Sequence, residues 1–402
     1  MASIAFSLSR PRPLIRALLS CAVLAFGLFV ITSRTVYVYQ IFFPMFTFSL
    51  ATVLIFHACA RRPWVDLVHV ACLTLLFGAI AFLWMYLPYH WMAWLGFAGV
   101  SSFVVLSIRA IWADGEERKL CLFAVTSCVL LLALEAAAGL ALRAAEPLFP
   151  RTLDLYLFSF DGSLGGQPSF WMGRAFAQWP LFAKTSIFFY NGLPLILALV
   201  CALQIRARSA KALPAVSAII LAGPIGLLFY SFFPALGPAH IPQLGFPWHP
   251  LAAAHATLAQ VAARGPRNAI PSLHMTWVLL CWWYTRGFAW WARAAAFLFI
   301  VSTVFSTIGS GEHYVVDLIV AFPFALFIES LFSSLPWRAP AKLAALAWGL
   351  SAVFTWLLLL RFIPGIFWLT PVIPWAFAAI TIAVSLWREA RLGSLPPFAN
   401  SL

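Results

Sequence analysis

The chain of 402 residues has little charge, and the acidic share of that charge is small. Only 9% of the residues are charged, and 12 aspartates and glutamates stand against 25 lysines and arginines. A soluble domain has about 25% charged residues and is about half apolar, whereas 63% of this chain is hydrophobic. This composition excludes a soluble globular protein and indicates a chain that lies mostly within a lipid bilayer.

The chain also lacks the cysteine spacing of a disulfide framework or of a metal site. The cysteines fall in apolar segments or near their predicted cytoplasmic ends, where no oxidising compartment would pair them. We therefore expect no disulfide, no metal and no other cofactor. The seven cysteines are Cys21, Cys59, Cys72, Cys121, Cys128, Cys201 and Cys281.

Long apolar runs account for most of the sequence. About 20 apolar residues cross a bilayer as a helix, and this length predicts an all-α, polytopic integral membrane protein with about 12 transmembrane helices. We interpret the first run as a helix that is retained, because no small-x-small cleavage site follows it. The predicted spans are 14–32, 37–59, 65–87, 90–112, 119–142, 185–205, 212–233, 271–286, 289–309, 314–335, 341–361 and 365–387.

The positions of the lysines and arginines predict the orientation. With both termini in the cytoplasm, most cations lie on the inner side, and most of the others lie in two long outer segments, 143–184 and 234–270. Long loops count less in the positive-inside rule. The net charge of +13 then forms a rim beside anionic lipid, so no nucleic-acid partner is needed. We expect a bacterial inner-membrane protein, with an interfacial helix over 251–263.

Two short histidine motifs interrupt this apolar sequence. The first ends at His274, after Pro271-Ser272-Leu273, and the second runs from Gly311 to Asp317 and contains His313. The spans that begin at these motifs are predicted to run in the same direction, so both histidines are expected at the outer face near helix N-termini. Such termini bind anions, and Asp317 lies one turn after His313, where it could orient the imidazole. The expected ligand is a phosphate.

Other polar residues have simpler interpretations. Most of the remaining histidines are expected to be hydrated at the membrane interface. For His240, a contact with the substrate is the less favoured alternative. Asp154 and Asp161 are interpreted as loop residues that accept hydrogen bonds, and Tyr314, like the many tryptophans, as an interfacial anchor.

The two motifs resemble the second and third signatures of the type-2 phosphatidic acid phosphatase superfamily. The third signature of that family is SRxxxGxHxxxD, and Ser306, Gly311, His313 and Asp317 match it, whereas Thr307 stands where the family has an arginine. The first signature, KxxxxxxRP, is missing from 234–270, where Gly237-Pro238-Ala239-His240 occurs instead. These departures resemble the inositol phosphorylceramide synthase branch rather than the hydrolases.

The resemblance implies roles for particular residues. His313 would be the nucleophile that forms a phosphohistidine, His274 the acid and base, and Asp317 the group that orients His313. Ser272, Gly311 and Arg267 would contact the substrate, and Arg267 is the nearest replacement for the missing cations. The implied reaction moves a phosphoryl-linked headgroup from a phospholipid donor to the hydroxyl of a lipid acceptor, without a metal.

The resemblance also divides the chain into three parts. Residues 119–335 would form a six-helix catalytic bundle, preceded by a four-helix extension over 1–118 and followed by two helices and a cytoplasmic tail over 336–402. A lipid phosphate phosphatase is the main alternative. A membrane transporter is less favoured, because no internal repeat is visible and the polar cluster lies at one face. A scaffold without activity would have no reason to place two histidines and an aspartate together.

Overall fold

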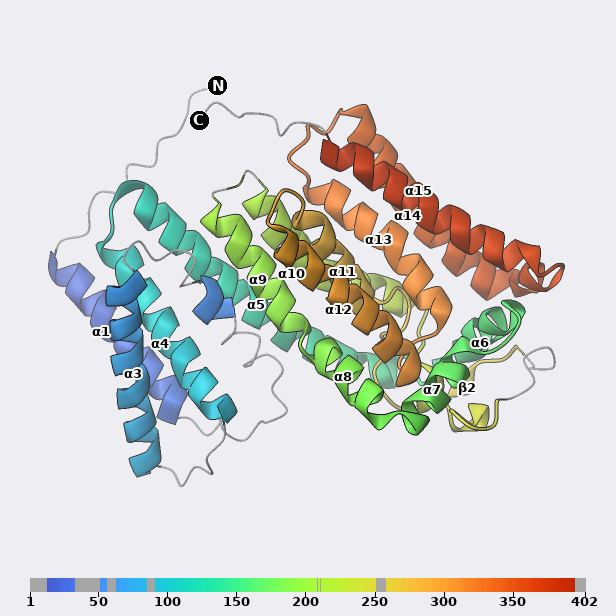
Figure 1. Ribbon diagram of the computed structural model, residues 1–402, viewed down its shortest axis with the longest axis horizontal. Helices are drawn as coiled ribbons and strands as arrows, with labels where there is room; N and C mark the ends of the chain where they lie inside the picture. The colour runs from blue at the N-terminus through green and yellow to red at the C-terminus, as the bar shows by residue number, and fades with distance from the viewer. Residues whose placement is uncertain are drawn as a thin grey trace. The chain divides into compact units, whose positions relative to one another are not determined.

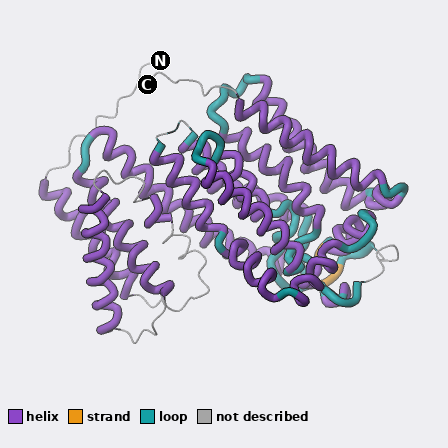
Figure 2. Tube along the Cα trace, viewed as in Figure 1, coloured by secondary structure: helices purple, strands orange, loops and turns teal. Residues whose placement is uncertain are grey.

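The computed structural model describes residues 13–32, 51–55, 63–84, 91–207, 209, 211–250 and 258–394. The chain divides into two compact units, Met1–Leu132 and Ala133–Leu402, and helix α5 (Gly115–Leu148) runs from the first into the second. Almost all of the regular structure is helical (Figures 1 and 2). The prediction of an all-α protein is confirmed for these residues.

The first unit contains three further helices that pack through apolar side chains. They are α1 (Pro13–Thr32), α3 (Pro63–Trp84) and α4 (Trp91–Trp112). Phe77, Phe97 and Val104 lie in its core. Arg109 of α4 binds both Asp66 of α3, at 2.6 Å, and Glu117 of α5, at 3.0 Å. Many other leucines and phenylalanines of these helices are exposed, so the surface of this unit is suited to contact lipid.

The second unit holds the two histidine motifs. Short helices precede the long ones: α6 (Asp154–Ser163), α7 (Pro168–Gln178), α8 (Pro180–Asn191) and α9 (Leu193–Arg206). The remaining helices are α10 (Ala212–Phe232), α11 (Leu273–Tyr284), α12 (Trp290–Gly309), α13 (Val315–Phe332), α14 (Pro340–Phe362) and α15 (Val372–Ser394).

Helix α13 is the centre of this unit. It contacts α10 and α11 on one side and α14 and α15 on another, and it is the most buried of the candidate membrane spans. Figure 1 shows α14 and α15 as a pair along α13, with α6 and α7 at one end of the long helices. Because α13 carries Asp317 in its first turn, its burial places that carboxylate inside the protein.

Among the described residues, nine helices are long and apolar enough to cross a membrane, and the bent pair α8–α9 would make ten. This supports a multi-pass membrane protein, although not the full count of twelve. Most of the predicted span 37–59 lies outside the described residues. Helix α11, with 12 residues, is about 18 Å long, which is short of a hydrocarbon core of about 30 Å.

The two long segments assigned to the outer side differ from the expectation. Residues 143–184 are mainly helical rather than loop, because the end of α5, α6, α7 and the start of α8 lie there. In the other segment, Val261–Ala262 forms strand β2, which pairs antiparallel with β1 (Arg151–Thr152). The interfacial helix expected over 251–263 is therefore wrong from residue 258 onward, and residues 251–257 lie outside the described residues. Figure 2 shows the strand among loops at one end of the unit.

Candidate active site

His313 lies between an aspartate and a serine. Its Nδ1 is 3.2 Å from Oδ2 of Asp317, and its Nε2 is 3.3 Å from Oγ of Ser272. All three side chains are buried. Since the carboxylate holds Nδ1, Nε2 is the nitrogen that is left to react. Ser272 also caps α11 by accepting the backbone N–H of Met275, so this contact joins the beginnings of α11 and α13.

His274 is the second imidazole of the site. It lies in the first turn of α11, two residues after Ser272, whose hydroxyl is next to Nε2 of His313. Its ring stacks on that of Tyr190, with centroids 4.1 Å apart, and the Tyr190 hydroxyl is 3.3 Å from Nδ1. The structure therefore brings together the two histidines that are 39 positions apart in the sequence, and Tyr190 fixes the ring of His274.

Two buried aspartates from α6 hold the loop that carries His313. Asp154 accepts the backbone N–H of Gly237, at 2.9 Å, and the hydroxyl of Tyr314, at 3.1 Å. Asp161 accepts the N–H groups of Val315 and Val316, at 2.9 and 3.4 Å, and so caps α13. The interpretation of both aspartates as acceptors is confirmed, although they lie in a helix. Tyr314 is fully buried, so its interpretation as an interfacial anchor is wrong.

Burial changes the proton affinity of these two carboxyls. It raises the pKa of Asp154 to about 6, although several hydrogen bonds to the carboxylate oppose the shift. Burial raises the pKa of Asp161 to about 8, and the nearby Asp317 adds to this rise. A buried carboxyl resists ionisation because the charged form loses its hydration. Asp161 therefore takes up a proton at a higher pH than an exposed aspartate does, while its two oxygens accept backbone N–H groups of α13.

Close backbone approach explains two glycines of the site. Gly311 has φ +75°, and a Cβ there would lie 2.8 Å from Cβ of Ala239 and 2.9 Å from the Phe246 ring. Gly237 has φ +147°, and its Cβ would overlap the carbonyl of Glu312. Both positions lack room for a side chain, so the loop before α11 is packed directly against the loop of His313.

The pair of His240 and Glu312 lies beside these glycines. Nε2 of His240 is 3.1 Å from Oε2 of Glu312, and both side chains are about one-third exposed. The bond to Glu312 raises the pKa of His240. Burial alone would raise the pKa of Glu312, but His240 holds it below its usual range. The pair favours its charged forms and lies beside the loop of His313.

Arg267 and Thr307 occupy positions where the resemblance calls for phosphate contacts. Arg267 is buried, and its nitrogens donate to the carbonyls of Phe149, at 2.9 Å, Ala263, at 2.8 Å, and Gly265. As a phosphate ligand it would have to exchange these bonds. The Thr307 hydroxyl donates to the carbonyl of Thr303 at 2.7 Å. Its own carbonyl accepts the N–H groups of Glu312 and His313.

Sequence reasoning missed the partners that position the histidines. Tyr190 and Ser169, whose hydroxyl donates to the carbonyl of His313 at 3.2 Å, lie far away in the sequence and in no motif. Ser306 matches the third signature, and its buried Oγ has no partner within the described structure, as is true of Oδ1 of Asp317. Within the described residues no group of three histidine, cysteine, aspartate or glutamate side chains could hold a metal ion.

The arrangement of this site agrees with a comparison to known families. Residues 155–331 match the sequence model of the PAP2 superfamily. This region runs from the second residue of α6 to the residue before the end of α13, and it contains His274, His313 and Asp317. Members of that superfamily are generally phosphatases or phosphotransferases, which supports an enzyme that acts on a lipid phosphate. No curated protein and no solved structure matches the chain.

Proposed function

We propose that the protein is a lipid phosphotransferase that moves a phosphoryl-linked headgroup, such as phosphoinositol, from a phospholipid to a lipid hydroxyl. The observation that carries this proposal is His313, whose Nδ1 faces Asp317 while its Nε2 faces Ser272 at the start of α11. An oriented nucleophile beside a second group that can handle a proton is the arrangement that covalent catalysis requires.

In the proposed reaction Nε2 of His313 attacks phosphorus, and the bond from phosphorus to the oxygen of the donor lipid breaks. His274 gives a proton to that leaving oxygen. His274 then takes the proton of the acceptor hydroxyl, whose oxygen attacks phosphorus and breaks the bond to His313. Asp317 stabilises the charged imidazole throughout. Gly311 and Ser272 contact the phosphate. The positive dipole ends of α11 and α13 favour its charge, although Asp161 already accepts the first N–H groups of α13.

The choice of transfer over hydrolysis rests on charge. A phosphomonoester carries up to about two negative charges near neutral pH, whereas a phosphodiester carries one. Thr307 supplies no cation, and Arg267 is bound to three carbonyls. Arg267 would join the phosphate only by exchanging these bonds. Two helix N-termini match a single charge better than a double one.

Transfer also requires that water is kept away from the phosphohistidine. His313 is 2% exposed. Phe246 packs against Phe170 and lies next to Gly311 and Gly173, so aromatic rings border the loop of His313. Trp171 and Trp248 are more than half exposed and are suited to contact acyl chains around the entry. These apolar side chains around His313 favour a lipid alcohol over water as the acceptor.

The deciding experiment offers both kinds of substrate to the purified protein. Headgroup-labelled phosphatidylinositol is mixed with ceramide or diacylglycerol, and phosphatidic acid is offered separately. We expect the label to move to the acceptor lipid in the wild type and in the exposed control His249→Ala, but not in His313→Ala. Ready cleavage of the monoester without any exchange of the diester would instead support a lipid phosphatase.

The proposal places the site at the outer face and both termini in the cytoplasm, with residues 119–335 as the catalytic part, 1–118 as an extension before it and 336–402 as an extension after it. An impermeant thiol reagent on intact cells tests the orientation in a background without native cysteines. Gln178→Cys and Gln243→Cys, both exposed, should be labelled, and Arg206→Cys should be protected. The opposite labelling pattern would show that the orientation in the membrane is the reverse of the one proposed.

A further inference from the structure

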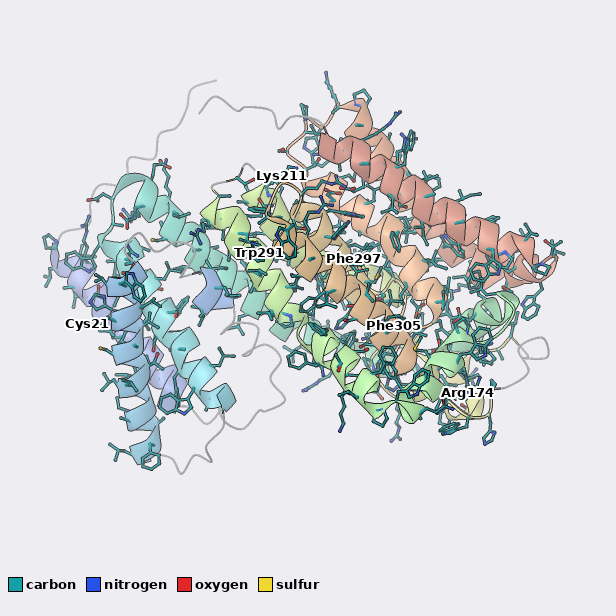
Figure 3. The ribbon with its side chains drawn as sticks, viewed as in Figure 1. Cys21, Arg174, Lys211, Trp291, Phe297 and Phe305 are labelled. Carbon is teal, nitrogen blue, oxygen red and sulfur yellow. The ribbon has the colours of Figure 1, made fainter. Side chains whose placement is uncertain are left out.

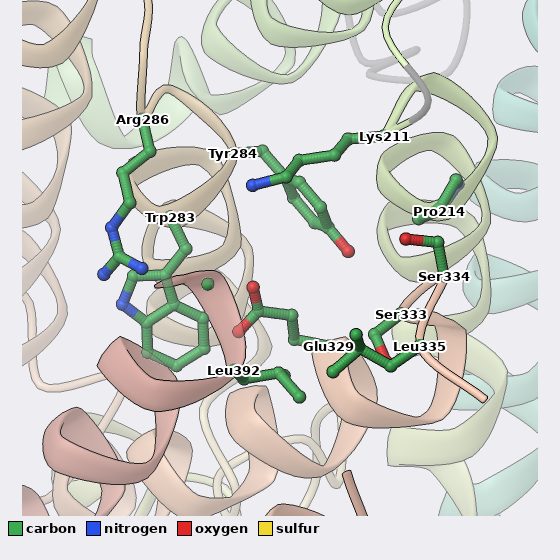
Figure 4. Close-up of a pocket in the computed structure, with 11 residues that line it drawn as sticks. Lys211, Pro214, Trp283, Tyr284, Arg286, Glu329, Ser333, Ser334, Leu335 and Leu392 are labelled. Atoms are coloured by element: carbon green, nitrogen blue, oxygen red, sulfur yellow. The ribbon is translucent and has the colours of Figure 1, made fainter. Parts of the chain in front are cut away.

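A polar pocket lies at the far end of α11 and α13 from the histidine pair (Figure 4). Its lining includes Lys211, Trp283, Tyr284, Arg286 and Glu329. Tyr284 is ten residues after His274 on α11, and Glu329 is twelve residues after Asp317 on α13. At 1.5 Å per residue these separations are about 15 and 18 Å, so the pocket is distinct from the histidine site. Figure 3 likewise shows Lys211 and Arg174, of α7, at opposite ends of the helices.

Unpartnered polar atoms surround this pocket. Nε1 of Trp283, the hydroxyl of Tyr284 and Oε2 of Glu329 are buried and have no hydrogen-bond partner within the described structure. The same is true of Oε1 of Glu389, which is adjacent on α15. These four side chains are at least 92% buried. Because native proteins satisfy nearly all buried polar groups, such a group of free donors and acceptors indicates a missing ligand.

Charges of both signs meet at the pocket. Arg286 binds one oxygen of Glu389 through Nη2, so that pair leaves the other carboxylate oxygen free. Lys211 and Glu329 line the pocket together. In Figure 4 the Lys211 ammonium, the Tyr284 hydroxyl and the Glu329 carboxylate project into the same space. A simple anion would be repelled by the glutamates, and a simple cation by Lys211 and Arg286.

We propose that this pocket binds the zwitterionic headgroup of an aminophospholipid, in which a primary ammonium lies next to a phosphate. The ammonium would donate to the free oxygens of Glu329 and Glu389, and the phosphate would accept from Lys211 and from the indole N–H of Trp283. These are charge-assisted hydrogen bonds, which are the stronger kind. The Tyr284 hydroxyl can serve either group.

The remaining lining favours a lipid over a free zwitterion in water. The polar groups are bordered by Pro214, Leu335 and Leu392. A small soluble ligand would make no favourable contact with these apolar side chains. They match the glycerol and the first carbons of the acyl chains. The site also lies at the end of helices that are apolar along their length, where headgroups are found.

The test measures lipid binding to the purified full-length protein in detergent, by native mass spectrometry. The added lipids are phosphatidylethanolamine, phosphatidylcholine, whose ammonium has no N–H, and phosphatidylglycerol, which has no ammonium. We expect the wild type to bind phosphatidylethanolamine at least about tenfold more tightly than the other two, the factor that a charge-assisted hydrogen bond provides. Glu329→Gln should reduce this preference, and Lys211→Gln should weaken the binding of all three lipids, because the phosphate is common to them. The exposed controls Glu116→Gln and Lys184→Gln should change neither the preference nor the binding.

The proposal is overturned if the wild type binds the three lipids equally, or if Glu329→Gln keeps the full preference. If free phosphoethanolamine competes as well as the lipid does, the conclusion that the bound headgroup belongs to a lipid is wrong. If Glu329→Gln is not monodisperse, Glu389→Gln replaces it, because Oε1 of Glu389 is the other proposed acceptor of the ammonium. His313→Ala should retain the preference, so this test is independent of the proposed reaction.

Discussion

The buried carboxyl groups at the two ends of α11 and α13 differ in their hydrogen-bond partners. At the histidine end, Asp161 accepts two backbone N–H groups, and Asp154 accepts backbone N–H groups and a tyrosine hydroxyl. At the other end, Glu329 and Glu389 each keep a buried oxygen without a partner in the described structure. The first pair of carboxyls holds a site together, and the second pair is suited to bind a ligand.

The direction of the helices explains this difference. A helix presents free N–H groups at its N-terminus and free carbonyls at its C-terminus. Both α11 and α13 begin at the histidine end, so a carboxylate there finds backbone donors, as Asp161 does at Val315. At the C-terminal end the helices present carbonyls, and Lys342 donates there to the carbonyls of Ser333, at 2.9 Å, and Leu335, at 3.2 Å. A glutamate at this end therefore depends on arginine, lysine or a ligand.

The largest expected effect separates the two ends by activity. His313→Ala should abolish turnover, because it removes the attacking nitrogen, and His274→Ala should reduce it by about 10²- to 10⁴-fold, the usual contribution of acid–base catalysis. Glu329→Gln should leave turnover within about twofold of the wild type, because Glu329 lies about 18 Å from Asp317 along α13. Initial rates of headgroup transfer in mixed micelles measure all three variants.

The matched control for this comparison is the folded state of each variant. All should elute as the wild type does and bind phosphatidylethanolamine at least as well as the control lipids. Substantial turnover in purified His313→Ala would remove His313 from the role of nucleophile. His274→Ala that accumulates phosphorus on the protein would show that attack precedes proton transfer.

A smaller effect is expected at Asp317. Asp317→Asn keeps the attacking nitrogen but loses the ionic hydrogen bond to Nδ1 of His313. A hydrogen bond to a charged group is worth about 1.5–3 kcal/mol, so the rate should fall by about 10- to 100-fold. The measurement is kcat at saturating donor lipid. A loss as complete as that of His313→Ala would mean that Asp317 does more than orient the imidazole.

One glycine at each end offers a comparison of stability. Gly311→Ala should lower the free energy of unfolding by at least about 1 kcal/mol, because φ is +75° and left-handed backbone costs about 1–2 kcal/mol for other residues. Its methyl group would also meet Ala239 and Phe246. Gly393→Ala should cost less, since its methyl group meets the flexible end of Arg286. Thermal unfolding in detergent compares them, and the reverse order would contradict the close packing at Gly311.

The smallest effect is a change in the pH dependence of stability. The pKa of Asp161 is raised to about 8 by burial, so the folded state binds a proton more tightly than the unfolded state does. Its contribution to stability is present at low pH and is lost as the pH rises from about 4 through 8. Asp161→Asn should flatten the fall in melting temperature between about pH 5 and 8. An unchanged slope in Asp161→Asn would show that Asp161 is ionised in the folded protein.

Several parts of the candidate site could be predicted from the sequence. His274 and His313 follow from two motifs, and their common face follows from the direction of the spans between them. Tyr190, Ser169 and the pocket around Glu329 could not be predicted, because nothing in their local sequence identifies their partners. Arg267 was a reasonable candidate from its distance to His274 along the chain, but the structure shows that its guanidinium is occupied by carbonyls.

The sequence by itself determined that the chain is helical and multi-pass, because the length and hydropathy of a run decide whether it can cross a bilayer. It also predicted that two histidines and an aspartate lie near the starts of two helices that run in the same direction. Only the tertiary structure decided which polar atoms are satisfied there and which are not. Tyr314 donates to Asp154, 160 positions away in the sequence. Glu329 of α13 lines a pocket with Arg286, from the turn after α11, and Arg286 binds Glu389 of α15. Hydrophobicity is a property of each residue, whereas the satisfaction of a buried hydrogen bond depends on what the fold places within about 3 Å.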